Sequence, residues 1–265
     1  MMTFKNIFPF RIGCTSYVIQ DEILPNVRMM SDKVDDIELV IFESPGFSNL
    51  PDNEEILELK SIAYKNCNTY SVHLPIDQKL AADDLQERST FLDSVLKITE
   101  LTRNLPISSY ILHLEGLKSP ESEEEIQRWT GCVNEFCEGL RYRSDIPFSL
   151  FAIENLSYEP GLHESFVLQH GFSNCIDLGH LWLQQSDWKQ YIADKITTVG
   201  VVHLHGVNNH NRDHLSLTSH ANCQEIMELL PILKNYTGVV TIEVFNEMDT
   251  FESLHYLKEL WQKLF

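Results

Sequence analysis

Short apolar runs rich in β-branched residues alternate along the chain with longer stretches of helical periodicity. Helical stretches follow each run, the last four near residues 161–170, 185–195, 220–234 and 249–264. Eight strand-helix units spaced roughly thirty residues apart predict one (β/α)8 barrel domain over residues 1–265. The expected strands are "FRIGCTSY", "DIELVIFE", "TYSVHLP", "SYILHLEG", "SLFAIENL", "NCIDLGH", "TVGVVHLHG" and "GVVTIEVF".

An open, doubly wound α/β sheet is the alternative architecture for such an alternation. Sheets of that kind that bind dinucleotides carry a Gly-rich phosphate loop after the first strand. No such loop follows "FRIGCTSY", and no low-complexity or Pro/Gly/Ser-rich segment divides the chain. The pattern therefore favours the closed barrel in a single domain.

Composition and charge restrict the partners. The 265 residues are 43% hydrophobic, which can fill a complete core, and carry a formal net charge of −19. This negative field opposes binding to nucleic acid or an anionic membrane, so we expect a small-molecule substrate and neither of those partners. Six scattered cysteines without a CxxC pair indicate neither disulfides nor a thiolate zinc site. Without a signal peptide or an apolar run of about 18 residues, we expect a cytoplasmic protein.

Histidines and carboxylates interrupt the apolar pattern where the third to eighth expected strands end. Because the carboxyl ends of barrel strands form one face, these side chains should meet in one site. Any one of them could be a hydrogen-bonded structural group, but six strands in succession favour a metal site. Imidazole and carboxylate ligands suit Zn, Mn, Fe or Co without choosing among them. The residues are His73, His113, Glu115, Glu154, Asp177, His203, His205 and Glu243.

Two spacings indicate which of these residues lie close together. Asp177 and His180 are separated by three positions across a strand-to-helix turn, close enough to converge. His203 and His205 share a strand face by the period of two, so one is expected as a ligand while the other orients it or binds substrate.

Glu154 and Glu243 follow residues of buried type, where an unpaired charge is costly and a cation is the natural partner. By contrast, His210 and His220 lie in polar, loop-like surroundings, and we expect both at the surface.

Seven segments together resemble a known superfamily. In order and spacing, "SVHLP", "ILHLEG", "AIENL", "CIDLGH", "VVHLHG", "RDHLSL" and "TIEVF" are similar to the xylose-isomerase-like barrels, which include endonuclease IV and sugar-phosphate isomerases and epimerases. The resemblance covers nearly the whole chain. Within the superfamily, "FRIGCTSYVIQDEILPNVRMMSDKVDDIELVIFES" and "RDHLSL" look most like the cobamide-remodelling phosphodiesterases.

The resemblance implies a ligand set for divalent metal. One departure is clear: in the last metal motif of endonuclease IV an aspartate stands two positions before the histidine, and here that position is Arg212. Arg212 suits a phosphate instead, because its planar fork matches that anion. Asp213 either assists His214 or is a plain loop carboxylate. The matching positions are Glu154, Asp177, His203 and Glu243 for one ion, and His73, His113, His180 and His214 for further ions.

The activity implied is hydrolysis of the nucleotide-loop phosphodiester of cobamides by a metal-dependent enzyme. The alternative is a metal-dependent sugar or sugar-phosphate isomerase or epimerase, in which the two glutamates of the same ligand set move a proton. The residues expected in catalysis are Glu154, Glu243, His205 and Arg212. Those expected at the substrate are His73, His113, Arg212 and Tyr17, with Tyr17, Phe47, Trp182 and Leu183 as candidate walls.

Overall fold

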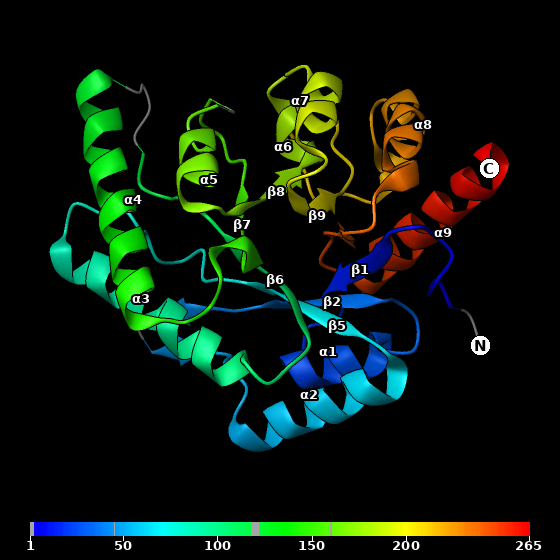
Figure 1. The fold of residues 1–265 in the computed structure, drawn as a ribbon. Coiled ribbons are helices and arrows are strands. Elements are labelled where there is room, and N and C mark those ends of the chain that lie inside the picture. The colour runs from blue at the N-terminus through cyan, green and yellow to red at the C-terminus, as the bar shows by residue number, and fades with distance from the viewer. Residues whose placement is uncertain (1–2, 45, 118–121, 160) are drawn as a thin grey trace.

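A closed barrel of parallel strands forms the centre of the protein (Figure 1). The computed structural model describes residues 3–44, 46–117, 122–159 and 161–265. Hydrogen bonds join the strands in the order β1, β10, β9, β8, β7, β6, β5 and β2, and β2 pairs with β1 to close the ring. The strands are β1 (Arg11–Thr15), β2 (Asp36–Val40), β5 (Thr69–His73), β6 (Ile107–Leu112), β7 (Phe151–Glu154), β8 (Ser173–Asp177), β9 (Val199–Leu204) and β10 (Val239–Ile242).

Helices surround the barrel and connect its strands (Figure 1). They are α1 (Ile23–Met30), α2 (Asn53–Asn66), α3 (Leu85–Thr102), α4 (Glu123–Arg143), α5 (Glu164–His170), α6 (Leu178–Leu183), α7 (Trp188–Lys195), α8 (Cys223–Ile232) and α9 (Glu247–Leu264). Short 3-10 turns η1 (Phe148–Leu150), η2 (Leu217–Ser219) and η3 (Leu233–Asn235) complete the connections.

The barrel interior changes from apolar to polar along its axis. Ile111, Ala152, Cys175, Val201 and Val239 form an apolar cluster contributed by five different strands. Further towards the carboxyl ends, His203 of β9 lies in register with Asp177 of β8 and Thr241 of β10. The apolar layer supports the strands, and the polar residues above it are held in fixed positions by the strand register.

The predicted (β/α)8 barrel is confirmed, and each of its eight strands overlaps one expected segment, although β6 and β8 begin two residues and one residue earlier. Two details differ. The helical stretch expected near 185–195 is α7, and a separate helix, α6, starts directly after β8 because the Asp177 side chain caps it. A small antiparallel hairpin of β3 (Glu43–Ser44) and β4 (Phe47–Ser48) was not expected. No helix in the described parts of the chain is long and apolar enough to cross a membrane.

Candidate active site

Glu154, the last residue of β7, lies at the centre of a group of histidines. Its Oε2 atom is 2.9 Å from His113 Nε2, 3.5 Å from His73 Nε2 and 3.5 Å from His203 Nδ1. The other ring nitrogen of His73, Nδ1, donates to the backbone carbonyl of Leu74 at 3.0 Å. That bond leaves Nε2 of His73 directed at Glu154, so this nitrogen donates to the carboxylate when it is protonated and can bind a metal ion when it is not.

His203 of β9 is fully buried between carboxylates. Its Nε2 atom is 3.0 Å from Glu38 Oε2, and its Nδ1 atom is 3.1 Å from Glu243 Oε2. Glu38, which belongs to β2 and is also fully buried, was not among the predicted site residues. A signal for it existed, since Glu38 is a charged residue inside the apolar run "DIELVIFE".

Asp177 holds two histidines in place. Its Oδ1 atom accepts a hydrogen bond from the His180 backbone N–H at 2.8 Å, and its Oδ2 atom is 3.2 Å from His205 Nε2. His205 Nδ1 in turn accepts from the His214 backbone N–H at 3.0 Å. Because both ring nitrogens of this fully buried histidine are used by the protein, His205 orients Asp177. Of the roles expected for His205, orienting a neighbouring side chain agrees with these contacts, and its expected part in catalysis stays a prediction.

A second group lies beside Glu154. One ligand atom from each of His180, Asp213 and His214 lies within 4.8 Å of the other two. The Nδ1 atoms of His180 and His214 are 2.8 Å and 3.1 Å from the backbone carbonyls of Asn155 and Glu243, so each ring presents its Nε2 lone pair. Of the two alternatives for Asp213, the geometry favours the one in which it assists His214.

Arg212 lies on the exposed side of the loop that carries this group. The loop is closed by backbone hydrogen bonds between Gly206 and Leu215, and the Asn208 side chain accepts from the Arg212 backbone N–H at 3.2 Å. Within the described residues, the Arg212 guanidinium makes no ion pair. It is therefore free to bind an anion.

A cavity of about 280 Å³ opens beside the histidines. Tyr17 contributes to its wall and makes edge-to-face contacts with Phe42 and Phe245, with both centroid separations 6.3 Å. The lining residues are Tyr17, Val40, Phe42, His73, Ile76, Glu243 and Phe245. The site thus combines ionisable side chains with a mainly apolar wall.

The other expected wall residues lie elsewhere. Trp182 is buried, with its ring 4.3 Å from that of His220, and Leu183 packs against the core. Phe47 is exposed on β4 and does not line the cavity. The expectation of a surface His220 was also wrong, because its ring is buried and bonds both the Val207 N–H and Glu225.

The histidines and carboxylates at the centre each shift the pKa values of the other towards the charged form. Burial alone would lower the pKa of His73, but the hydrogen bond to Glu154 and the charges of Glu38, Glu154 and Glu243 raise it to about 9. Burial would raise the pKa of Glu154, but His113 and His203 hold that pKa well below its ordinary value. Without a bound metal ion, protonated His73 and His203, whose pKa values the neighbouring carboxylates raise, thus serve as cations of this acidic cluster.

The donor set fits a divalent cation. Among the described residues, His203 Nδ1 and Glu243 Oε2 are buried atoms without a hydrogen-bond partner. They are only 3.1 Å apart, and Glu154 Oε2 is 3.5 Å from the same nitrogen. Buried polar atoms without partners are costly, and a cation among them would satisfy both of these atoms and also lie beside Glu154 Oε2.

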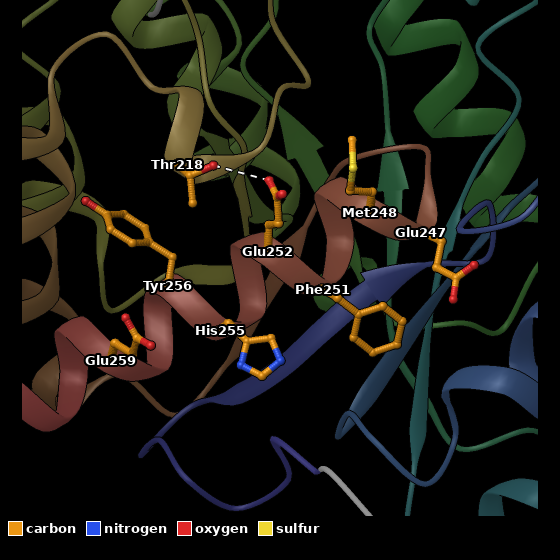
Figure 2. Close-up of a pocket in the computed structure, with 8 residues that line it drawn as sticks. All are labelled: Thr218, Glu247, Met248, Phe251, Glu252, His255, Tyr256 and Glu259. Carbon is orange, nitrogen blue, oxygen red and sulfur yellow. Dashed lines mark hydrogen bonds between the residues drawn. The ribbon is translucent and has the colours of Figure 1, made fainter.

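The protein also has a surface groove of about 730 Å³ along α9 (Figure 2). Its side chains project from the outer surface of that helix, with Thr218 of η2 at one edge bonded to Glu252. None of the histidines and carboxylates of the centre lines it. We therefore place the candidate active site at the barrel mouth. The groove residues are Thr218, Glu247, Met248, Phe251, Glu252, His255, Tyr256 and Glu259.

A closed parallel barrel with histidines and carboxylates at the carboxyl ends of its strands is the arrangement found in TIM-barrel enzymes. The chain belongs to the xylose isomerase-like TIM barrel family, whose model matches residues 32–260. Members of this family include epimerases and endonuclease IV. Curated protein sequences give no significant match.

Solved structures share the fold at low sequence identity. A D-tagatose 3-epimerase-like protein is 19% identical, with a TM-score of 0.75 over 96% of this chain and 98% of its own. Endonuclease IV from Thermus thermophilus is 13% identical, with a TM-score of 0.69 over 96% and 99%. A protein from the same organism, soaked with ZnCl2, is 18% identical, with a TM-score of 0.68 over 97% and 99%.

Proposed function

We propose that the protein is a metal-dependent hydrolase that cleaves a phosphodiester, and that its substrate is the nucleotide loop of a cobamide. The observation that carries the proposal is the extension of the donor set on two sides of Glu154. Its Oε2 faces His73 and His113, and its Oε1 lies 3.7 Å from Nδ1 of the His180 ring, whose other nitrogen is left for the group with Asp213 and His214. Phosphodiester cleavage develops charge on both attacking and leaving oxygens, so it benefits from more than one cation.

The roles follow from position and charge. Divalent ions bound there would lower the pKa of a water molecule and offset charge on the phosphate oxygens. Arg212 would bind the phosphate through its guanidinium fork, and His205 would keep Asp177 oriented. As the family resemblance implies, Glu154, Asp177, His203 and Glu243 would hold one ion. Two groups whose ligand atoms lie within 4.8 Å of one another would serve further ions: His73, His113 and Glu154, and His180, Asp213 and His214.

The cavity supports a substrate that has an apolar part. Its volume of about 280 Å³ is near the lower end of small-molecule sites, which begin at about 300 Å³. It would hold one ring system beside the metal ligands, with the rest of a corrinoid outside the barrel mouth. Tyr17, Phe42 and Phe245 would supply the aromatic contacts.

The test is anaerobic incubation with adenosylcobalamin or adenosylpseudocobalamin and each of Mn²⁺, Fe²⁺, Zn²⁺ and Co²⁺. Chromatography then measures loss of the lower nucleotide. We expect metal-dependent cleavage that Glu154→Ala abolishes. The control is Glu228→Ala, which should retain cleavage because Glu228 lies on the outer helix α8, where its carboxylate pairs with Lys189. An intact cobamide under every metal would refute the proposal.

A second candidate is a sugar or sugar-phosphate epimerase or isomerase. Glu154 and Glu243 both face His203 Nδ1, so two carboxylates flank one position, as proton removal and return next to a polarised carbonyl would require. The fold similarity to a D-tagatose 3-epimerase-like protein supports it. Interconversion of a ketose with its epimer or aldose, with cobamides left intact, would establish this candidate instead.

A further inference from the structure

Glu38 reaches the candidate metal centre from a strand that is not adjacent to the strand of His203. It belongs to β2, whereas its partner His203 belongs to β9, and β1 and β10 separate these two strands in the barrel. Both side chains are fully buried, and Glu38 Oε2 is 3.0 Å from His203 Nε2. Within the described residues, the second carboxylate oxygen of Glu38 has no hydrogen-bond partner. The contact with His203 is therefore the hydrogen bond that holds this carboxylate.

We propose that Glu38 is a positioning residue that fixes the ring of His203 so that Nδ1 faces Glu154 and Glu243. A carboxylate only accepts hydrogen bonds, so Nε2 of His203 carries the proton that it donates to Glu38. When a metal ion binds, the neutral ring directs the lone pair of Nδ1 at it, and Nδ1 lies 3.1 Å from Glu243 Oε2 and 3.5 Å from Glu154 Oε2. A carboxylate behind a ligating histidine orients the ring and raises its basicity.

Asp36 provides a matched control on the same strand and the same face. It is also a fully buried carboxylate, two residues before Glu38. Its oxygens accept from Ser71 N, Ser71 Oγ, Thr69 Oγ1 and Ser108 Oγ, none of which belongs to the metal centre. A general effect of removing a buried charge from β2 should therefore be the same at both positions.

The experiment measures binding of Co²⁺ or Zn²⁺ to the full-length metal-free protein, by competition with a chelating dye and by the visible spectrum of bound Co²⁺. The inference rests on the metal site of the proposed function, but the readout needs no substrate. Glu38→Gln keeps the volume of the side chain and removes its charge. We expect its affinity to fall about 10- to 100-fold, the usual effect of losing such a partner, and its Co²⁺ spectrum to shift. Asp36→Asn should keep both properties.

A double-mutant cycle separates positioning from general destabilisation. In a His203→Ala background, Glu38→Gln should cause no further loss of affinity, because the ring that it orients is gone. Wild-type protein that binds no metal would overturn the proposed function together with this inference. Wild-type protein that binds metal, with equal affinity in Glu38→Gln or an equal loss in Asp36→Asn, would overturn the inference alone.

Discussion

Gly179, near the start of α6, provides the sharpest test of how His205 supports the centre. A Cβ atom at this position would lie 1.9 Å from His205 Cε1 and 2.5 Å from His205 Nε2. Gly179→Ala must therefore displace the ring and break its 3.2 Å contact with Asp177. In an unobstructed helix, Gly→Ala stabilises the fold by about 0.5–1 kcal/mol. Here we expect the opposite, a lower free energy of unfolding.

The expected change in the free energy of unfolding follows from two costs and one gain. Loss of a hydrogen bond to a charged group costs about 1.5–3 kcal/mol. Overpacking of a tight interior costs about 1–3 kcal/mol. After subtracting the helix gain of about 0.5–1 kcal/mol, we expect Gly179→Ala to lower the free energy of unfolding by about 2–5 kcal/mol. Metal affinity should fall about 10- to 100-fold, because Asp177 loses the partner that orients it.

The assay is denaturant unfolding of the metal-free protein together with metal titration. Gly131→Ala is the control, because Gly131 lies inside α4 with nothing within 4 Å of the added Cβ, and it should be neutral or stabilising. In a His205→Ala background, Gly179→Ala should cost little, since the obstructing ring is absent. A Gly179→Ala protein with wild-type stability and wild-type metal affinity would refute this account of His205.

Three further predictions concern the same site. Metal affinity, measured by titration from about pH 6.5 to about pH 9, should rise with pH, because the raised pKa of His73 keeps it protonated until about pH 9 and metal must displace that proton. In the metal-free protein, the contribution of His73 to the free energy of unfolding should be complete below pH 6.5 and lost as the pH rises through about 9. If neither metal affinity nor the free energy of unfolding changed with pH over this range, the interactions of His73 with the carboxylates would be contradicted. Arg212→Ala should raise KM or lower kcat about tenfold or more, the worth of a charge-assisted bond, with unchanged Tm and metal content; early unfolding with normal kinetics would give Arg212 a structural role. Asp213→Ala should lower the number of bound ions in elemental analysis while the ion at Glu154, Asp177, His203 and Glu243 remains; an unchanged number would make Asp213 a plain loop carboxylate.

The sequence by itself predicted the barrel and the face that carries the site. Alternating strand and helix periods record which positions are buried, and burial patterns of this kind are local along the chain. Polar residues at the ends of successive strands must then meet, because parallel strands present their carboxyl ends on one side. For this reason the sequence alone predicts that Glu154, Asp177 and Glu243 lie near one another.

Only the tertiary structure decided which atoms of these residues contact which partners. The period of two places His203 and His205 on one face, but it does not say which ring nitrogen meets which partner. Glu38 precedes His203 by 165 positions, so no local pattern could pair them. The loop after β9 brings the Asp213 carboxylate towards His180 and His214, and its bend is set by Asn208 and by the pairing of Gly206 with Leu215. Such contacts depend on side-chain direction and loop closure across the barrel, which are properties of the packed fold and not of any one segment.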